Sequence, residues 1–365
     1  PICYFPSVSA AWRMDQEAFM ENFSTWLSLL KVRGSYGSLG NNGGTSVGNY
    51  DAISTYATQN YILNNGLSMG MAQTAIANAN LTWETTYITD IGIDFGFLNN
   101  KLTGTADYFK KRTDNILIDL PAPSVHGNAS IPKQNSAEVV NEGIELSLGW
   151  QDHINDFSYH INGNFTWLKN EVTRFKGDEK ALNGAKMIME GYPINVQYVR
   201  IVDRIIQTDE DLAIVQKMLD NAPLDENGKP KKVFSSGTPE KGDLLYKDLN
   251  NDGLVNDDDR TTVGTGPTPK FTYGLNMGAS WKGIDLSIFF QGMAGVKMYF
   301  MDNTYRPVTG FGWAMNKTIA EGRWYEGRTD ATYPRVMDTS DNRNGLASDF
   351  WVQNKSYFKI KNIQL

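Results

Sequence analysis

Apolar and polar residues alternate along several long segments of the chain. In residues 86–98 the odd positions are mostly apolar or aromatic, whereas the even positions include Asp90, Gly92, Asp94 and Gly96. A period of two with one apolar face predicts a β-strand whose other face is wet. The same alternation covers residues 102–108, 144–151, 157–167, 271–281 and 284–290. We expect about ten to twelve such strands and therefore an all-β protein.

Short turns separate some of these segments. Asn99 and Asn100 lie between Leu98 and Lys101, and Lys282-Gly283 joins two later segments. Asn and Gly tolerate the positive φ that a two-residue hairpin turn requires. Other connections are predicted to be long and irregular: residues 40–81, 120–137, 207–244 and 300–350. Short turns that alternate with long loops are typical of an outer-membrane barrel.

The length of the predicted strands separates soluble from membrane architecture. Strands of soluble proteins run about 5 to 6 residues, whereas a strand that crosses a bilayer needs about 9 to 11. Aromatic residues also lie near the predicted strand ends, as the girdles of a barrel do: Trp83, Phe95, Phe97, Trp150, Trp167 and Trp281. The pattern predicts a transmembrane antiparallel β-barrel. A soluble β-sandwich with an aromatic core is the alternative.

Composition excludes several functions. The mean hydropathy is -0.41, and no run of about 18 apolar residues would allow a helical membrane span. The net charge of -7 argues against a nucleic-acid partner, because phosphate binding needs clustered Lys and Arg. The chain has one cysteine, so it forms no internal disulfide and offers no zinc or redox cluster.

The sharpest local motif lies at residues 248–259. Oxygen-bearing residues occupy the ligand positions of an EF-hand-like calcium loop: Asp248, Asn250, Asp252, Leu254, Asn256 and Asp259. Gly253 supplies the sharp turn at the sixth position of the loop. Asp replaces the usual Glu at the last position, so we expect a structural and weakly bound Ca²⁺. The alternative is an Asx-rich turn held by its own side-chain hydrogen bonds.

Catalytic chemistry finds little support in the sequence. The three histidines are His126, His153 and His160, and none has a motif that places it beside a nucleophile. No enzyme is expected.

Seven short segments, in a fixed order, carry a resemblance to known proteins. They read FPSVSAAWR (residues 5–13), LKVRGSYGSLGN (30–41), LTWET (81–85), DYFKKRTD (107–114), NEGIE (141–145), YKDLN (246–250) and YPR (333–335). Together they resemble the SusC/RagA family of TonB-linked outer-membrane proteins. Ordered matches over nearly the whole chain are more specific than any single motif.

The resemblance implies an architecture and a role. Residues 1–365 would be part of a plugged, 22-stranded barrel with long extracellular loops, and the plug domain and final strands would lie outside this stretch. The protein would import oligosaccharides or peptides across the bacterial outer membrane. A SusD-like surface lipoprotein would act as a lid, and the TonB-ExbB-ExbD complex would supply energy. Polar wall residues would line the passage: Asp90, Asp94, Asn162 and Asn164.

Candidate ligand contacts crowd one predicted loop: Tyr305, Phe311, Trp313, Trp324 and Tyr325. Exposed aromatic rings stack on sugars or peptide side chains, but packing within the loop or contact with the lid protein is an equal alternative. Two further functions stay open from sequence. One is a soluble, calcium-stabilised carbohydrate-binding or adhesion protein, and the other is a passive porin.

Overall fold

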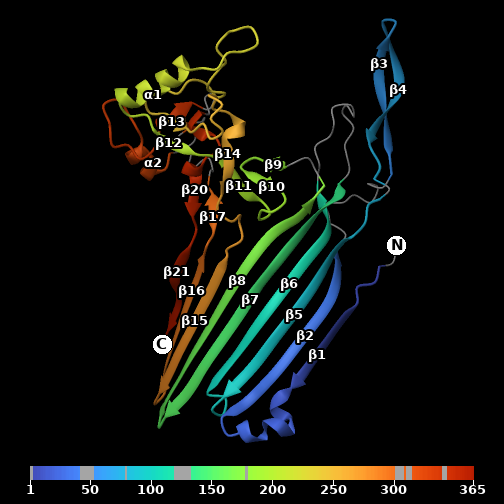
Figure 1. The fold of residues 1–365 in the computed structure, drawn as a ribbon, viewed down its shortest axis with the longest axis vertical. Helices are drawn as coiled ribbons and strands as arrows, with labels where there is room; N and C mark the ends of the chain where they lie inside the picture. The colour runs from blue at the N-terminus through green and yellow to red at the C-terminus, as the bar shows by residue number, and fades with distance from the viewer. Residues whose placement is uncertain are drawn as a thin grey trace.

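A long antiparallel sheet dominates the protein in the computed structural model (Figure 1). The structure describes residues 3–41, 53–78, 80–118, 133–176, 180–300, 308–309, 315–338 and 343–365. The sheet contains nine strands in chain order, each antiparallel to its neighbours. They are β1 (Ser7–Arg13), β2 (Leu27–Asn41), β5 (Glu84–Phe97), β6 (Leu102–Ile118), β7 (Gln134–Ile154), β8 (Phe157–Phe175), β15 (Phe271–Trp281), β16 (Ile284–Ala294) and β21 (Tyr357–Gln364).

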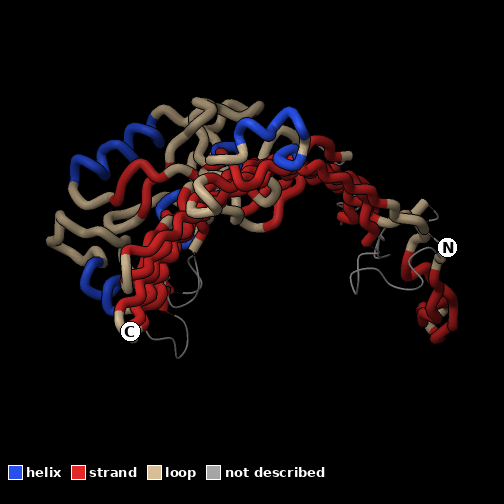
Figure 2. The backbone as a smooth tube through the Cα atoms, turned by 90° about the horizontal axis from the view of Figure 1, so that it is seen from below, coloured by secondary structure: helices blue, strands red, loops and turns tan. Residues whose placement is uncertain are grey.

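The register gives the sheet one apolar and one polar face. Ile93 lies opposite Ala106, which lies opposite Leu146, and this apolar row continues across the sheet. The next row along β5 begins with Asp94 and continues through polar residues. Because successive side chains point to opposite faces, the alternation seen in the sequence becomes two chemically different surfaces. Seen from below in Figure 2, the sheet forms an arc.

Aromatic pairs lie near both ends of the strands. Close to the short turns, Trp26 stacks on Phe97 with ring centroids 5.5 Å apart. At the other end, Phe165 stacks on Phe271 at 6.0 Å. These pairs agree with the predicted aromatic girdles.

The short turns lie at one end of the sheet and the long connections at the other (Figure 1). Leu98, Asn99 and Asn100 all have positive φ, between 52° and 61°. Lys282 and Gly283 also have positive φ, 48° and 85°. The two-residue turn at Lys282-Gly283 is confirmed, since Trp281 pairs with Ile284. A tight turn also forms at Asn99-Asn100, but it has four residues, Leu98–Lys101, because Phe97 pairs with Leu102.

The described residues contain eleven strands of seven or more residues, nine in the sheet and two in a separate hairpin, which agrees with the predicted ten to twelve. Three regions predicted to be irregular contain regular elements, and residues 300–350 include the helix α2 (Lys317–Gly322). Residues 40–81 contain a separate hairpin of β3 (Thr55–Leu63) and β4 (Gly66–Ala75), which pair only with each other in the described chain. Their turn consists of Asn64 and Asn65, both with positive φ, so the same turn chemistry applies here.

Residues 207–244 likewise contain a helix, α1 (Asp209–Asp220). Thr208 accepts a hydrogen bond from the Asp211 N–H, and the Asp211 side chain in return accepts one from the Thr208 N–H. This reciprocal capping box fixes the first turn of the helix. No described helix of the protein is both long and apolar enough to cross a membrane.

Two of the long connections fold together into what we call the loop module, comprising residues 180–265 and the described part of 296–356. Besides α1, its elements are β9 (Ala181–Asn183), β10 (Lys186–Ile188), β11 (Val196–Arg200), β12 (Val202–Ile205), β13 (Leu244–Tyr246), η5 (Asp257–Asp259), β14 (Arg260–Val263), β17 (Lys297–Tyr299), β18 (Val308–Thr309), α2 (Lys317–Gly322), β19 (Met337–Asp338), η7 (Arg343–Gly345), η8 (Asp349–Trp351) and β20 (Val352–Asn354). Two further short elements, η1 (Met14–Gln16) and η2 (Ala18–Phe23), lie between β1 and β2.

The loop module has its own hydrophobic core. Ile206, Val215, Phe234, Leu244 and Tyr246 are buried in one cluster. Large apolar side chains of the sheet, by contrast, are often exposed. The module is therefore a small folded body at the loop end of the sheet.

Candidate functional site

The polar face of the sheet carries a network of ion pairs centred on Arg33. This side chain reaches Asp90 at 3.2 Å, Asp94 at 3.1 Å and Asp107 at 2.5 Å. Lys31 also pairs with Asp94, at 3.1 Å. One guanidinium thus links strands β2, β5 and β6, because its planar fork presents several donors at once.

Gly92 allows this network to form. A Cβ atom at this position would lie 2.1 Å from Asp107 Oδ1 and 2.8 Å from Arg33 Cζ. The Arg33 side chain therefore crosses β5 over bare backbone to reach Asp107 on β6. Of the wall residues expected from sequence, Asp90 and Asp94 join this network, whereas Arg33, Lys31 and Asp107 were missed. Charged residues within an alternating segment were the signal that could have found them.

Asn162 and Asn164 lie on the same polar face, further round the sheet. Asn164 occupies the cross-strand row that includes Asp94, and its side chain lies close to Gly274. The wall residues predicted from sequence therefore share a face but do not form one cluster.

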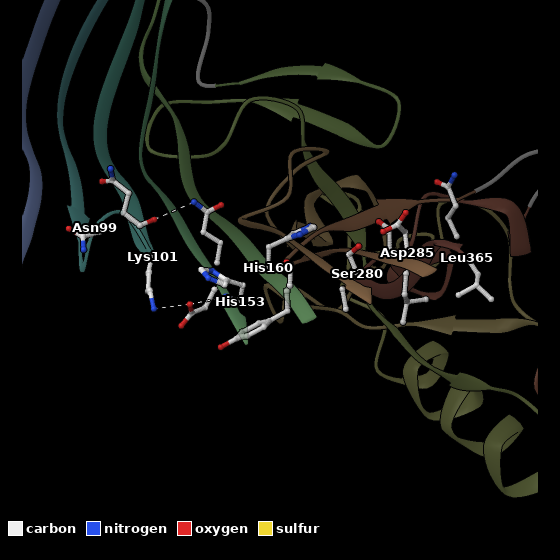
Figure 3. Close-up of a pocket in the computed structure, with 16 residues that line it drawn as sticks. Asn99, Lys101, His153, His160, Ser280, Asp285 and Leu365 are labelled. Atoms are coloured by element: carbon white, nitrogen blue, oxygen red, sulfur yellow. Dashed lines mark hydrogen bonds and ion pairs between the residues drawn. The ribbon is translucent and has the colours of Figure 1, made fainter. Parts of the chain in front are cut away.

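A cavity of about 930 Å³ opens at the short-turn end of the sheet. Figure 3 shows its lining, which includes His153, His160, Ser280 and Asp285. The imidazole of His160 lies across Gly278, where a Cβ atom would be 2.2 Å from the ring. Most of the lining residues are polar and come from the wet face of the strands, and Ala279 and Leu286 add apolar surface. A concave polar face suits the inside of a barrel.

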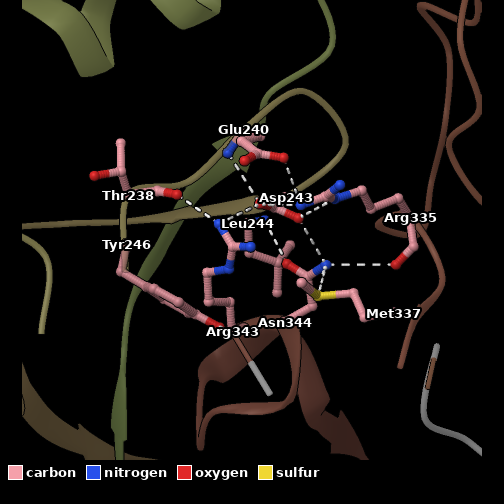
Figure 4. A network of polar contacts seen from close by, with 9 residues as sticks. All are labelled: Thr238, Glu240, Asp243, Leu244, Tyr246, Arg335, Met337, Arg343 and Asn344. Carbon is pink, nitrogen blue, oxygen red and sulfur yellow. Dashed lines mark hydrogen bonds and ion pairs between the residues drawn. The ribbon is translucent and has the colours of Figure 1, made fainter. Parts of the chain in front are cut away.

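The loop module is fastened by a buried carboxylate, Asp243 (Figure 4). Asp243 is fully buried, and Arg335 donates two hydrogen bonds to it, at 2.6 and 3.1 Å. Arg343 lies 3.5 Å away, and Asn344 Nδ2 donates a further bond at 3.1 Å. The hydrogen bond to Asp243 raises the pKa of Arg335, although burial opposes it.

Around this carboxylate, backbone groups of distant segments are tied together. The Leu244 N–H donates to Asn344 Oδ1 at 2.8 Å, and the Tyr246 hydroxyl donates to the Arg343 carbonyl at 2.7 Å. These bonds join residues about a hundred positions apart in the chain. The network therefore locks the connection between β8 and β15 to the connection between β16 and β21.

The predicted calcium loop adopts the compact turn its spacing requires. The Gly253 N–H donates to Asp248 Oδ2 at 2.9 Å, and the Leu254 N–H donates to Asp252 Oδ1 at 2.8 Å. Asn250 Oδ1 accepts from the Asp252 N–H at 3.0 Å. Side chains at the first, third and fifth positions thus point back over the loop.

The last predicted ligand, Asp259, is fully buried and binds backbone. Its carboxylate accepts hydrogen bonds from Leu249 N–H at 2.8 Å and from Asn256 N–H at 2.9 Å. Asp248 Oδ1, in contrast, is buried without a hydrogen-bond partner in the described residues. Within the described ranges, no three His, Cys, Asp or Glu side chains converge as a metal site. The loop is therefore held mainly by its own hydrogen bonds. Asp248 Oδ1 is the predicted ligand oxygen that is buried and available to a cation.

Asp257, within this loop, connects it to the rest of the module. Its carboxylate pairs with Arg200 and with Arg260, the latter at 2.9 Å. Burial lowers the pKa of Arg200, although the negative charge of Asp257 opposes this. The Arg200 N–H also donates to the Ala347 carbonyl at 2.9 Å. The calcium-like loop therefore abuts the same loop-to-loop junction.

The predicted aromatic ligand contacts divide into two sets. Tyr305, Phe311 and Trp313 lie outside the described residues. Trp324 packs against Gly242, where a Cβ atom would be 2.4 Å from the indole, so this side chain supports the loop module. Tyr325 is 58% exposed. Of the two described residues, Tyr325 is the exposed one, and the Arg328 guanidinium lies 5.7 Å from the centroid of its ring.

The whole chain matches one family of known proteins. A family model described as TonB dependent receptor-like, beta-barrel, matches residues 4–357. The chain belongs to this family. TonB-dependent receptors are outer-membrane proteins, so the sheet is part of a transmembrane barrel in the outer membrane. Within the described residues, the nine long strands form one continuous layer and not two packed sheets, which excludes the β-sandwich.

Individual relatives confirm the resemblance to SusC and RagA. The chain is 27% identical over 363 residues to TonB-dependent receptor P3 of Formosa agariphila, covering 99% of this chain and 34% of that protein. It is 24% identical over 376 residues to the TonB-dependent receptor SusC of Bacteroides thetaiotaomicron, again covering 99% and 34%. The chain spans about a third of the length of these receptors.

A solved structure shows the same fold. The RagAB peptide importer in its open-open state superposes with a TM-score of 0.70 and 25% identity, covering 99% of this chain and 36% of that one. A further structure, the RagAB peptide transporter, gives 0.68 and 24%. The nine strands therefore occupy the place of a barrel segment in a TonB-dependent receptor.

Proposed function

We propose that this chain forms part of the wall and mouth of a TonB-dependent importer of oligosaccharides or peptides. In this proposal a SusD-like lipoprotein closes the extracellular mouth, and the TonB-ExbB-ExbD complex supplies the energy. The receptor makes and breaks no bonds in its ligand, so it is not an enzyme.

The two faces of the sheet carry this proposal. An apolar row such as Ile93, Ala106 and Leu146 suits lipid, whereas the ion pairs of Arg33 suit a wet interior. A wall that is apolar outside and polar inside is what a transport barrel requires. Both glycan and peptide ligands remain candidates, since the chain resembles both SusC and RagA.

The test uses the full-length receptor in its native host. We expect it to fractionate with the outer membrane, to co-purify with an acylated surface protein, and to support ligand uptake that stops when TonB is deleted. Uptake that continues without TonB would identify a passive porin and overturn the proposal. If the receptor purifies without any acylated protein, the part of the proposal that assigns a lipoprotein lid is wrong.

We further propose that residues 248–259 bind one structural Ca²⁺. The support is the buried, unpartnered Asp248 Oδ1 beside the turned-in side chains of Asn250 and Asp252. Hard oxygen ligands at this spacing suit Ca²⁺, and the ion would add ligands from Leu254, Asn256 and Asp259.

Calcium binding is tested by hydrogen exchange of residues 248–259 in the full-length receptor. We expect slower exchange with about 1 mM Ca²⁺, the range of weak extracellular calcium modules, than with a chelator. The Asp248→Asn variant should lose this difference while keeping the Gly253 hydrogen bond. Equal exchange with and without Ca²⁺ in the native sequence would leave the Asx-rich turn as the whole explanation.

A further inference from the structure

The β3–β4 hairpin presents large apolar side chains to solvent on one face. Cross-strand pairing places Ile62 opposite Leu67, and Met69 and Met71 follow on the same face. We call these four residues the hairpin face. Their exposed fractions are 78%, 75%, 79% and 70%. Such a contiguous apolar surface on a soluble part of a protein marks an interaction site.

The opposite face of the hairpin is different. Tyr61 lies over Gly70, where a Cβ atom would be 2.8 Å from its ring, and it is 48% exposed. Leu63, beside the turn, is the one large aliphatic side chain on this face and is 64% exposed, and the remaining positions are small or polar. Most of the exposed apolar surface therefore lies on the hairpin face.

The segment also lacks charge. Residues 52–83 contain no Asp, Glu, Lys, Arg or His, whereas 21% of the chain is charged. Exposed strand edges are usually protected from aggregation by charged residues, above all Lys. An isolated two-stranded hairpin is also only marginally stable in water. An uncharged, apolar and isolated hairpin is therefore expected to be covered in the working assembly, by a surface that is itself uncharged and apolar.

The position of the hairpin decides what covers it. Figure 1 shows β3 and β4 extending beyond the loop end of the sheet, with their tip slightly beyond the level of α1 on the other side. Strands of 9 and 10 residues reach about 30 Å. The tip therefore points away from the short-turn end and from the lipid-facing rows. A protein lying across the mouth, in contact with both the hairpin and the loop module, is the occupant that fits.

The base of the hairpin is fastened to the sheet while the tip is not. Asn78 Nδ2 donates to the Lys133 carbonyl at 3.0 Å. Asn135 of β7 accepts from the Thr82 N–H at 2.9 Å and donates to the Thr82 carbonyl at 2.8 Å. A partner held at the tip is thereby connected to the barrel wall.

We propose that the hairpin face is a docking site for the surface lipoprotein that closes the mouth, an inference that rests on the proposed function. Methionine side chains adapt to different packing partners. Met69 and Met71 thus suit an interface that repacks as a lid opens and closes. The complementary patch on the lid is apolar and uncharged.

Photo-crosslinking locates the occupant. A benzoylphenylalanine is placed at position 69 in the full-length receptor, and at position 59, on the opposite face, as the matched control. The partner used is the acylated protein that co-purifies with the native receptor, identified by mass spectrometry and then purified. We expect crosslinks to this protein from position 69 and few from position 59. Crosslinks from position 69 only to the receptor itself, or to lipid, would overturn the proposal.

Affinity gives a second, independent measurement. The double variant Leu67→Asp with Met69→Asp should weaken binding of the purified lipoprotein by about tenfold or more, a loss of about 1.4 kcal/mol. The control variant Gln59→Asp with Ser68→Asp adds the same charge to the opposite face and should bind normally. Heat-modifiability on gels reports that both barrels are folded.

The outcomes separate this inference from the proposed function. If the native receptor binds no lipoprotein, the proposed function has failed. If the native receptor and the Leu67→Asp, Met69→Asp variant bind the lipoprotein equally well, only the docking site is wrong.

Discussion

The sheet and the loop module are held together in opposite ways. In the sheet, strands pair with sequence neighbours, apolar side chains point outward, and charged groups such as Arg33 lie on the inner face. In the module, apolar side chains such as Leu244 are buried at the centre. There a charged group, Asp243, joins segments far apart in the chain.

This difference reflects the two solvents. Lipid accepts apolar side chains, so the sheet needs no apolar core, but it must satisfy every backbone group between strands. The module is surrounded by water and needs a buried core to fold. The two regions should therefore respond differently to the loss of one charge.

The largest effect is expected at the buried carboxylate of the module. Arg335→Met removes two hydrogen bonds from the fully buried Asp243, and breaking such a pair costs about 3–5 kcal/mol. Asp243→Asn should cost less, about 1–3 kcal/mol, because Arg335 is partly exposed and can be hydrated. Hydrogen exchange of β13 in the full-length receptor measures both.

A matched control is Lys317→Ala, which removes an exposed ion pair with Glu321 in the same module. Its effect should stay below about 1 kcal/mol. The barrel strands should keep their protection in all three variants. Loss of protection in β5 or β6 after Arg335→Met would contradict the separation of the two regions.

The same contrast explains what could be predicted from sequence. Period-two alternation predicted β5, β6 and the turn at Asn99, because neighbouring strands pair locally and lipid selects one face. It missed the pairing of Asp243 with Arg335, because contacts between segments 92 residues apart leave no local pattern. The hairpin of β3 and β4 was missed although Asn64-Asn65-Gly66 is a turn signal.

For the site, spacing alone predicted the turned-in geometry at Asp248 and Asn250, because an Asx-rich loop is a local structure. It did not predict that Asp259 would bind backbone N–H groups. The aromatic residues of this loop were predicted either to contact ligand or to pack within the loop; Trp324 packs inside the module, whereas Tyr325 faces outward. Side-chain direction in a long loop depends on tertiary packing.

A smaller effect is expected at the polar face of the sheet. Arg33→Gln removes the cation that pairs with Asp90, Asp94 and Asp107. Of these three carboxylates, Asp94 keeps an ion pair, with Lys31. We expect a cost of about 1.5–3 kcal/mol, the contribution of hydrogen bonds to charged groups. Gly92→Ala should cost about 1–3 kcal/mol through crowding of Asp107 and Arg33. Urea midpoints of the folded barrel on gels measure both variants.

Combining the two changes tests whether they act on one network. The double variant should cost less than the sum of the single ones, since both disturb the same contacts. Lys101→Gln, which removes a single pair with Asp152 at the short-turn end, is the control and should change stability by less than about 1 kcal/mol. If the stability costs of Arg33→Gln and Gly92→Ala add, Gly92 does not act by making room for the Arg33 network.

The smallest effect concerns the start of α1, where the module can be perturbed without touching its core. Thr208→Ala removes the side-chain acceptor of the Asp211 N–H and should cost about 1 kcal/mol. Burial disfavours the charged form of Asp211, but the N–H groups of Gln207 and Thr208 and the Arg204 guanidinium outweigh it and lower the pKa of Asp211. Hydrogen exchange of the α1 amides, corrected for intrinsic rates, measures both the cost of Thr208→Ala and the pH dependence that Asp211 causes.

The sign of the pH dependence follows from that lowered pKa. The unfolded chain, with Asp near its ordinary pKa of about 3.9, binds the proton more tightly than the folded helix. The stability that Asp211 contributes is therefore complete above about pH 5 and is lost as the pH falls through the folded pKa. Asp211→Asn should be less stable at neutral pH and should lose this acid dependence. An unchanged acid slope in Asp211→Asn would place the titrating group elsewhere in the module. The β5 and β6 amides, which α1 does not contact, should keep their protection over the same pH range.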